Sequence, residues 1–285
     1  MEENLEFSVE PNAGWDPRVT CLKCGDLVRS YLIKTERFVV VYDTLLGPKS
    51  GGLLREEALK LADSRPLLVV NSHADWDHYF GNMVFSEPIL GTQNMVDRVT
   101  GGVGEKELED KRKEHPESYG PVRLTPPSIA VPGEATLHGG DLTLQLLHTR
   151  GHRPDHLALY IPEIQTLLPG DCVEDPIPLV DEDSDGTSRT IEELKHSLRR
   201  FLDLQPDWVL ANHAAPERGT TRIESNLQYL IKLQEAALAS PSLEQLKTAW
   251  PAEENWDEFY QKAHRSHLRM ARQQMNQARP KWADD

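Results

Sequence analysis

The sequence predicts a layered α/β fold, because short apolar runs typical of strands alternate with longer amphipathic segments typical of helices. No segment repeats another, which argues against a solenoid or an array. Hydrophobic residues make up 38% of the 285 residues, which is sufficient for a full hydrophobic core. No linker divides the chain, so we expect a single domain over residues 1–285.

The predicted strands are short, alternating or rich in β-branched residues, and bounded by Gly, Pro, Asn or Asp. They cover residues 28–33, 38–42, 67–70, 142–147, 157–161, 166–168 and 208–211. The segment 19–32 also has the pattern of a strand, and it carries Cys21 and Cys24. Because side chains alternate along a strand, these two cysteines are expected on opposite faces, as structural residues rather than as half of a zinc ribbon.

The predicted helices include two with apolar residues on one stripe, 191–204 and 222–239, and a last one that is polar. They cover residues 53–62, 191–204, 222–239 and 254–278. Between them, residues 101–127 are polar and charged and end in Pro. We interpret this segment as a lid or an insertion over a site.

The charge of the chain excludes some classes of function. Lys and Arg number 31 against 46 Asp and Glu, giving a net charge of −15 at pH 7, which repels nucleic acids and anionic membrane surfaces. Residues 1–10 lack the regions of a signal peptide, and no apolar run approaches the roughly 18 residues that span a bilayer. An odd number of cysteines, three, fits a reducing compartment. We therefore expect a cytoplasmic protein with a small-molecule substrate and no nucleic-acid or membrane partner; the oligomeric state stays open.

Metal-binding residue types gather where predicted strands end. Residues 71–78, Asn-Ser-His-Ala-Asp-Trp-Asp-His, directly follow the strand 67–70. Three later segments, 148–152, 170–171 and 212–213, follow strands in the same way and supply further His and Asp residues. Site residues of α/β proteins assemble at such strand ends, and Asp and His side chains this dense repel or desolvate one another without a cation. The sequence therefore predicts a metal site.

In these four segments the chain resembles the metallo-β-lactamase superfamily, whose pattern is His-x-His-x-Asp-His, then a His in a Gly-His turn, then Gly-Asp and a late His. The resemblance covers residues 28–216, with a C-terminal helical extension over 220–280. It implies an αββα sandwich, in which two mixed β-sheets are flanked by helices and the metals lie at one edge.

The resemblance also implies seven ligands for two divalent ions: His73, Asp75, Asp77, His78, His152, Asp171 and His213. By the family's roles, His73, Asp75 and His152 would bind one ion, Asp77, His78 and His213 the other, and Asp171 both. A hydroxide bridging the ions would attack a small ester, lactone, thioester or amide. Asp77 would also be catalytic, because it would orient the hydroxide and relay a proton.

Asp75 departs from the family pattern, since it stands where the second His is usual. A carboxylate in place of a neutral imidazole adds a negative charge, which makes Mn or Fe plausible beside Zn, the usual metal of the family. Flavodiiron proteins of the same superfamily also carry a carboxylate here. The alternatives to a hydrolase are therefore an iron-dependent redox or oxygen-handling protein, and a metal-binding module without catalysis.

Other residues near the motifs are assigned lesser roles. His148 and His156 are interpreted as residues that support the ligands, and Trp76 and Tyr79 as residues that line the pocket or pack the loop.

A second pattern fits a calcium loop, with Asp181, Asp183, Asp185 and Gly186 followed by Glu192. The prolines before Asp181 exclude the entering helix that such loops have, so an acidic insertion near the rim of the site is the alternative.

Overall fold

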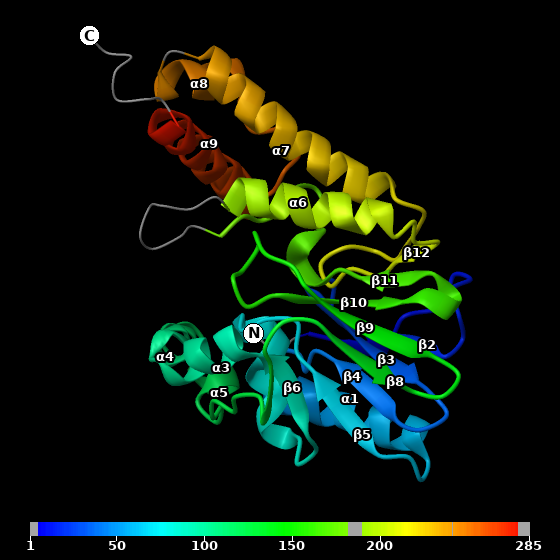
Figure 1. Cartoon of the computed structure of the whole chain (residues 1–285). Coiled ribbons are helices and arrows are strands. Elements are labelled where there is room, and N and C mark those ends of the chain that lie inside the picture. Colours follow the sequence, from blue (N-terminus) through cyan, green and yellow to red (C-terminus); the bar gives the residue numbers. More distant parts are fainter. Residues whose placement is uncertain (1–4, 182–189, 241, 279–285) are drawn as a thin grey trace. The chain divides into compact units, whose positions relative to one another are not determined.

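The computed structural model describes residues 5–181, 190–240 and 242–278, and it divides into two compact units (Figure 1). The first unit comprises Met1–Thr149, Asp155–Gly170 and Pro206–Gly219. The second unit comprises Arg150–Pro154, Asp171–Gln205 and Thr220–Asp285.

The first unit contains a sheet of seven strands in sequence order: β1 (Phe7–Val9), β2 (Val19–Cys24), β3 (Val28–Lys34), β4 (Val39–Tyr42), β5 (Leu67–Val70), β6 (Ile89–Thr92) and β7 (Ile129–Val131). Strands β1 to β4 pair antiparallel, and β4 to β7 pair parallel. The expectation of one strand over 19–32 is wrong. Gly25 adopts a positive φ of 58°, and the chain reverses there so that β3 pairs back onto β2.

A second sheet of six strands lies in the same unit. Its order is β13 (Glu217–Arg218), β12 (Trp208–Val209), β11 (Thr166–Leu168), β10 (Leu157–Ile161), β9 (Thr143–His148) and β8 (Ala135–His138). The pair β11 and β12 is parallel and the other pairs are antiparallel. Two mixed sheets with helices confirm the predicted fold class.

The core lies between the two sheets. Val40 and Tyr42 of β4 pack in one apolar cluster with Leu157 and Leu168 of the second sheet. The Tyr42 hydroxyl donates a hydrogen bond of 2.7 Å to the carbonyl of Leu157, which ties the sheets together. The two apolar faces therefore bury each other, as expected for a sandwich.

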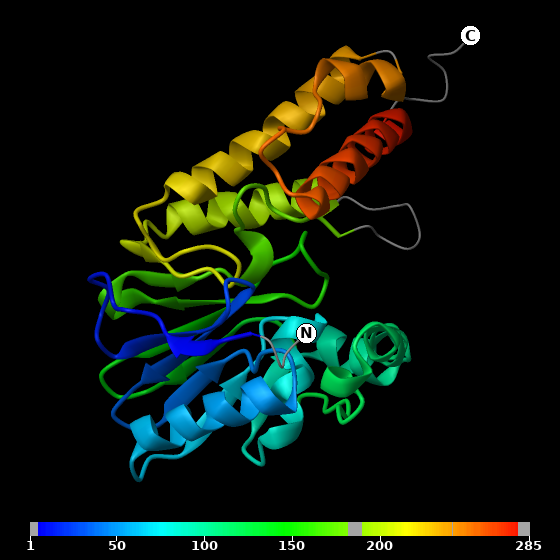
Figure 2. The ribbon, with the colours of Figure 1, turned by 180° about the vertical axis from the view of Figure 1, so that it is seen from behind.

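The outer face of the first sheet is covered by α1 (Pro48–Ala62), as Figure 2 shows. Val39 and Val41, which alternate with the inward residues of β4, pack there against Leu54 of α1. Cys21 belongs to the cluster between the sheets and Cys24 to this outer cluster, so the predicted opposite orientation of the two cysteines is confirmed.

The predicted lid or insertion is helical. It contains α4 (Val103–Glu114) and α5 (Pro116–Tyr119), and it follows α3 (Gln93–Thr100). Tyr119 and Leu108 pack with Tyr79 and Met95 in a third apolar cluster. These helices escaped sequence prediction because α4 is mostly charged and buries little besides Leu108.

The second unit is built around α6 (Thr190–Asp203), α7 (Thr221–Ala239), α8 (Leu243–Ala249) and α9 (Glu258–Ala278). Helix α7 packs on both α6 and α9. The predicted helices 191–204 and 222–239 are confirmed to within one residue, whereas the last helix begins four residues later than predicted. Throughout the described ranges, none of the helices combines the length and apolar character needed to cross a membrane.

A chain of hydrogen bonds joins three buried side chains in the second unit. The amide of Val180 donates to Nε2 of His267, so Nδ1 of His267 carries the proton and donates to the Tyr229 hydroxyl at 3.0 Å. The Tyr229 hydroxyl donates in turn to Nδ1 of His264 at 2.9 Å, whose Nε2 donates to the carbonyl of Trp250. Every donor in this chain meets an acceptor while both histidines are neutral.

Candidate metal centre

The loop after β5 carries four of the predicted ligands, two of them at the start of the short helix α2 (Trp76–Tyr79). A reciprocal pair of amide hydrogen bonds between Asn71 and Asn82 closes the segment. The carboxylate of Asp155 accepts the amide hydrogen of Ala74 at 2.7 Å. These bonds satisfy buried polar groups of the loop and fix its path.

Asp43 contacts the predicted ligand His78 and was not predicted from the sequence. It is fully buried and adopts a positive φ of 65° directly after β4. Its carboxylate accepts hydrogen bonds from the amide and hydroxyl of Ser72, from Nδ1 of His78 and from the Asn212 side chain, at 2.6 to 3.0 Å. Its place at the end of a strand, which the predicted ligands share, is the signal that could have found it.

Asp77, His78 and His213 come together, although His213 is 135 residues further along the chain than His78. His213 Nε2 lies 3.3 Å from an oxygen of Asp77 and 3.2 Å from Nε2 of His78. Nδ1 of His78 donates to Asp43, and Nδ1 of His213 donates to the carbonyl of Leu27 at 2.6 Å. Both histidines therefore point the Nε2 atom toward the other ring.

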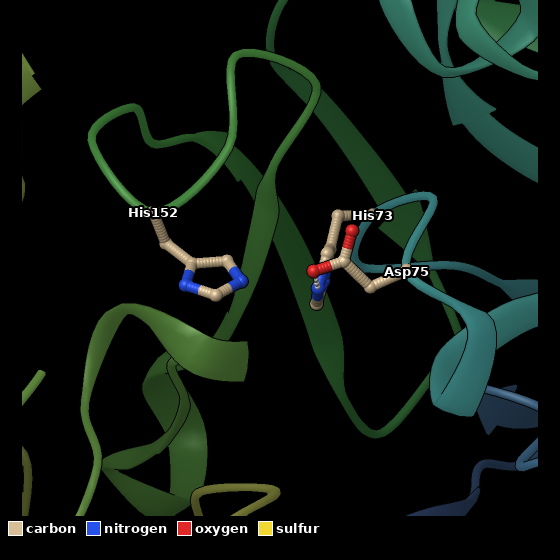
Figure 3. Close-up of side chains that lie close together, drawn as sticks. All are labelled: His73, Asp75 and His152. Carbon is tan, nitrogen blue, oxygen red and sulfur yellow. Dashed lines mark ion pairs between the residues drawn. The ribbon is translucent and has the colours of Figure 1, made fainter. Parts of the chain in front are cut away.

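His73 and Asp75 lie side by side in the first unit (Figure 3). His73 Nε2 is 3.5 Å from Oδ2 of Asp75, and the other oxygen of Asp75 pairs with Arg98 of α3 at 3.4 Å. Nδ1 of His73 lies 2.9 Å from the hydroxyl of Ser72. His152, also labelled in Figure 3, belongs to the second unit.

In the second unit, His152 lies with two carboxylates. Its Nε2 is 3.6 Å from Asp171, and its Nδ1 is 3.3 Å from the carbonyl of Leu179 and 3.8 Å from Glu174. Glu174 is 1% exposed, and it accepts hydrogen bonds from the amide of Leu179 and the hydroxyl of Tyr260. Glu174 was not predicted from the sequence, where its one signal is its place three residues after Asp171.

The profile of the metallo-β-lactamase superfamily matches residues 25–213, about the range that the sequence motifs indicated. The chain belongs to the metallo-β-lactamase superfamily. None of the curated proteins that were compared with the chain matches it.

Several solved structures share the fold of this chain. A metallo-β-lactamase family protein from Thermus thermophilus is 19% identical, with a TM-score of 0.64 and coverage of 96% of this chain and 94% of that one. A β-lactamase domain protein from Burkholderia ambifaria is 20% identical, with a TM-score of 0.62 and coverage of 84% of this chain and 83% of that one. A stereoselective inverting sec-alkylsulfatase from Pseudomonas sp. is 16% identical, with a TM-score of 0.65 and coverage of 91% and 49%. At these identities the likeness shows the fold alone.

Four further residues singled out from the sequence surround the superfamily motif. His156 is fully buried, with Nδ1 2.8 Å from the Thr149 hydroxyl and its ring against Gly170, which is a structural arrangement. His148 is the last residue of β9 and is half-buried. Trp76 packs edge-on against Tyr119 and below the ammonium group of Lys111. Tyr79 is fully buried, and burial raises the pKa of its hydroxyl.

The calcium-loop pattern falls partly outside the described residues, since Asp183, Asp185 and Gly186 lie in the range 182–189. Asp181 forms an ion pair of 2.7 Å with Arg153. Glu192 accepts hydrogen bonds from Lys195 and Gln234. Calcium binding by this segment stays a prediction.

Proposed function

We propose that this superfamily member is a dinuclear metal-dependent hydrolase of a small ester, lactone, thioester or amide. Its ligands would be the seven side chains that the motif indicates: His73, Asp75, Asp77, His78, His152, Asp171 and His213. His73 and Asp75 would share one ion with His152, and Asp171 would bridge the two ions. The donor set Asp77–His78–His213, which lies within the first unit, suits the second ion of this arrangement.

The main support for this proposal is that the Nε2 atoms of His78 and His213 face each other. Each ring places Nδ1 at a fixed oxygen that accepts its proton, so in the neutral form of both rings the two Nε2 atoms would direct lone pairs at each other across 3.2 Å. Two lone pairs at this distance repel unless a cation lies near both. Asp77 adds a carboxylate to the same point, which favours a divalent ion over a proton.

The donor atoms also fit the metals of the superfamily. Imidazole nitrogens and carboxylate oxygens are usual ligands of Zn²⁺, and they also suit Mn and Fe. The protons on Nδ1 of His78 and His213 are held by an aspartate and a backbone carbonyl, as is common for histidines that bind metals. Two bound ions would lower the pKa of a water molecule and polarise the scissile bond.

The chain's own residues would position and transfer protons. One oxygen of Asp77 lies 3.7 Å from Nε2 of His78 and the other 3.3 Å from Nε2 of His213, and this carboxylate would orient the attacking water and pass a proton to the leaving group. The net charge of −15 disfavours nucleic acid as the substrate. Proteins with this fold include a sec-alkylsulfatase, so a sulfate ester belongs on the substrate panel.

Metal content combined with a substrate panel tests the proposal. Protein purified without added metal is expected to hold about two Zn, Mn or Fe ions per chain, and the His213→Ala variant about one. The matched control is His138→Ala, because His138 is exposed in β8. Asp77→Asn should abolish the turnover of any substrate that the wild type hydrolyses.

Other results would favour the alternatives. Visible iron absorption and oxygen consumption without hydrolysis would indicate an iron redox protein. Bound metal with no turnover above that of Asp77→Asn would indicate a binding module, and a wild type without metal would exclude all three.

A further inference from the structure

The two oxygens of Asp75 face different partners. Oδ2 lies 3.5 Å from Nε2 of His73, the other ligand proposed for this ion in the first unit. Oδ1 lies 3.4 Å from a terminal nitrogen of Arg98. The Arg98 guanidinium therefore pairs with one oxygen of Asp75 and His73 with the other.

Arg98 is held in place by the helix that carries it. Helix α3 is capped by Thr92, whose hydroxyl accepts the amide hydrogen of Met95. Met95 and Val99 flank Arg98 on the helix and are buried in the apolar cluster with Tyr79. Nε of Arg98 donates to the carbonyl of Ala74 at 3.3 Å while the terminal nitrogen reaches Asp75. One planar guanidinium thus forms hydrogen bonds with two residues of the loop that carries the ligands, Ala74 and Asp75.

The charges of the pair have a direct consequence for a bound cation. Asp75 stands where the superfamily pattern has a neutral histidine, so the substitution alone adds one negative charge to the ligand set. Arg98 adds one positive charge beside it, and both side chains are largely shielded from water, at 12% and 20% exposed. Screening is weak at such sites, so the two charges offset each other.

We propose that Arg98 is a positioning residue that sets the metal preference of the first ion site, by restricting Asp75 to one ligand oxygen and offsetting its charge. This inference rests on the proposed function. While Arg98 pairs with Oδ1, Asp75 can offer the ion one oxygen, and the pair adds no net charge to the ligand set. In both respects Asp75 then resembles the histidine that it replaces, which suits four-coordinate Zn²⁺. Without Arg98, both oxygens and the full charge of Asp75 would be available, which favours the harder Mn²⁺.

The test measures the affinities of metal-free protein for Zn²⁺ and Mn²⁺ by competition with a chelator. Arg98→Gln is expected to raise the ratio of Mn²⁺ to Zn²⁺ affinity about tenfold, within the range that partners of metal ligands control. Arg98→Lys keeps the positive charge but has a single donor group. Its ratio of Mn²⁺ to Zn²⁺ affinity should therefore stay nearer that of the wild type than the ratio of Arg98→Gln does. The matched control is Arg55→Gln, which removes a comparable ion pair with Glu87.

A double-variant cycle adds a second readout. Asp75→His should weaken Zn²⁺ binding, because it leaves the guanidinium beside a neutral ligand, and Asp75→His/Arg98→Gln should recover most of that loss. A purely structural role for Arg98 would lower both affinities by the same factor and leave the ratio unchanged. An unchanged ratio, or no recovery in the double variant, overturns the inference while the proposed function stands. A wild type that binds neither ion overturns both.

Discussion

Asp43 accepts the Nδ1 proton of His78 across 2.9 Å, and both side chains are fully buried. The same carboxylate accepts a hydrogen bond from Asn212, the residue before His213. One buried aspartate therefore orients a histidine from the loop after β5 and holds the segment that carries another.

Asp43→Asn should weaken metal binding by about 10- to 100-fold, because an amide neither fixes the tautomer of His78 nor balances the charge of the ion. Chelator competition measures this loss. Asp26→Asn is the matched control, since Asp26 is 94% exposed and pairs only at the surface with Lys23. Equal affinities for wild type and Asp43→Asn would contradict the role given to Asp43.

Removal of metal should destabilise the fold around His78 and His213, because their Nε2 atoms then face each other without a cation. Each site would contribute about 2.7 kcal/mol at a free metal concentration of about 100 times Kd. Thermal unfolding with and without a chelator measures the difference, and added metal should reverse it. A midpoint that does not respond to either treatment would count against a metal at this pair.

Tyr229→Phe should lower the free energy of unfolding by about 1–3 kcal/mol, because it leaves polar atoms of His264 and His267 buried without a partner. Tyr79→Phe is the matched control. The Tyr79 hydroxyl is also buried but has no hydrogen-bond partner in the described part of the chain, so its loss should cost little. Urea unfolding of the two variants compares them, and equal losses would show that the hydrogen-bonded chain contributes nothing.

Stability should fall as the pH decreases from about 6.5 toward 3. Burial, together with the neighbouring His264, lowers the pKa of His267 to about 3, and burial also lowers the pKa of His264. Between the unfolded and folded pKa values the unfolded chain binds protons that the folded chain does not, so acid favours unfolding. Urea unfolding at several pH values measures this effect. Between pH 7 and 5 the free energy of unfolding of His267→Gln should fall by less than that of the wild type. Parallel pH profiles would refute this.

Gly81→Ala should destabilise the protein by about 2–4 kcal/mol, because an added Cβ would overlap the backbone oxygen of Thr44. Gly52→Ala is the contrasting change. A Cβ at Gly52 meets nothing within 4 Å, and Gly52 lies inside α1, so this variant should gain about 0.5–1 kcal/mol. Denaturant unfolding compares the two, and a Gly81→Ala protein as stable as Gly52→Ala would show that the close approach is not required.

The strands at the centre of both sheets were predicted well because burial dictates their residues. The predicted bounds of β5, β10 and β11 agree with the structure, and all three are almost wholly buried. Helices α3 to α5 were not predicted, because α3 and α5 are short, at eight and four residues, and α4 is mostly charged and buries little besides Leu108. The turn at Gly25 was missed because apolar residues continue on both sides of it.

The sequence by itself determined the superfamily and the residue types that can bind metal, because His and Asp follow strand after strand in the order of the motif. Only the tertiary structure decided that Asp43 fixes the ring of His78, that Arg98 faces Asp75, and which nitrogen of His213 faces His78. These relationships depend on how strands and helices distant in the chain pack beside one another. Local sequence patterns do not specify distances between residues far apart in the chain. Hydrogen-bond partners and charge pairs of this kind are therefore known only from the assembled structure.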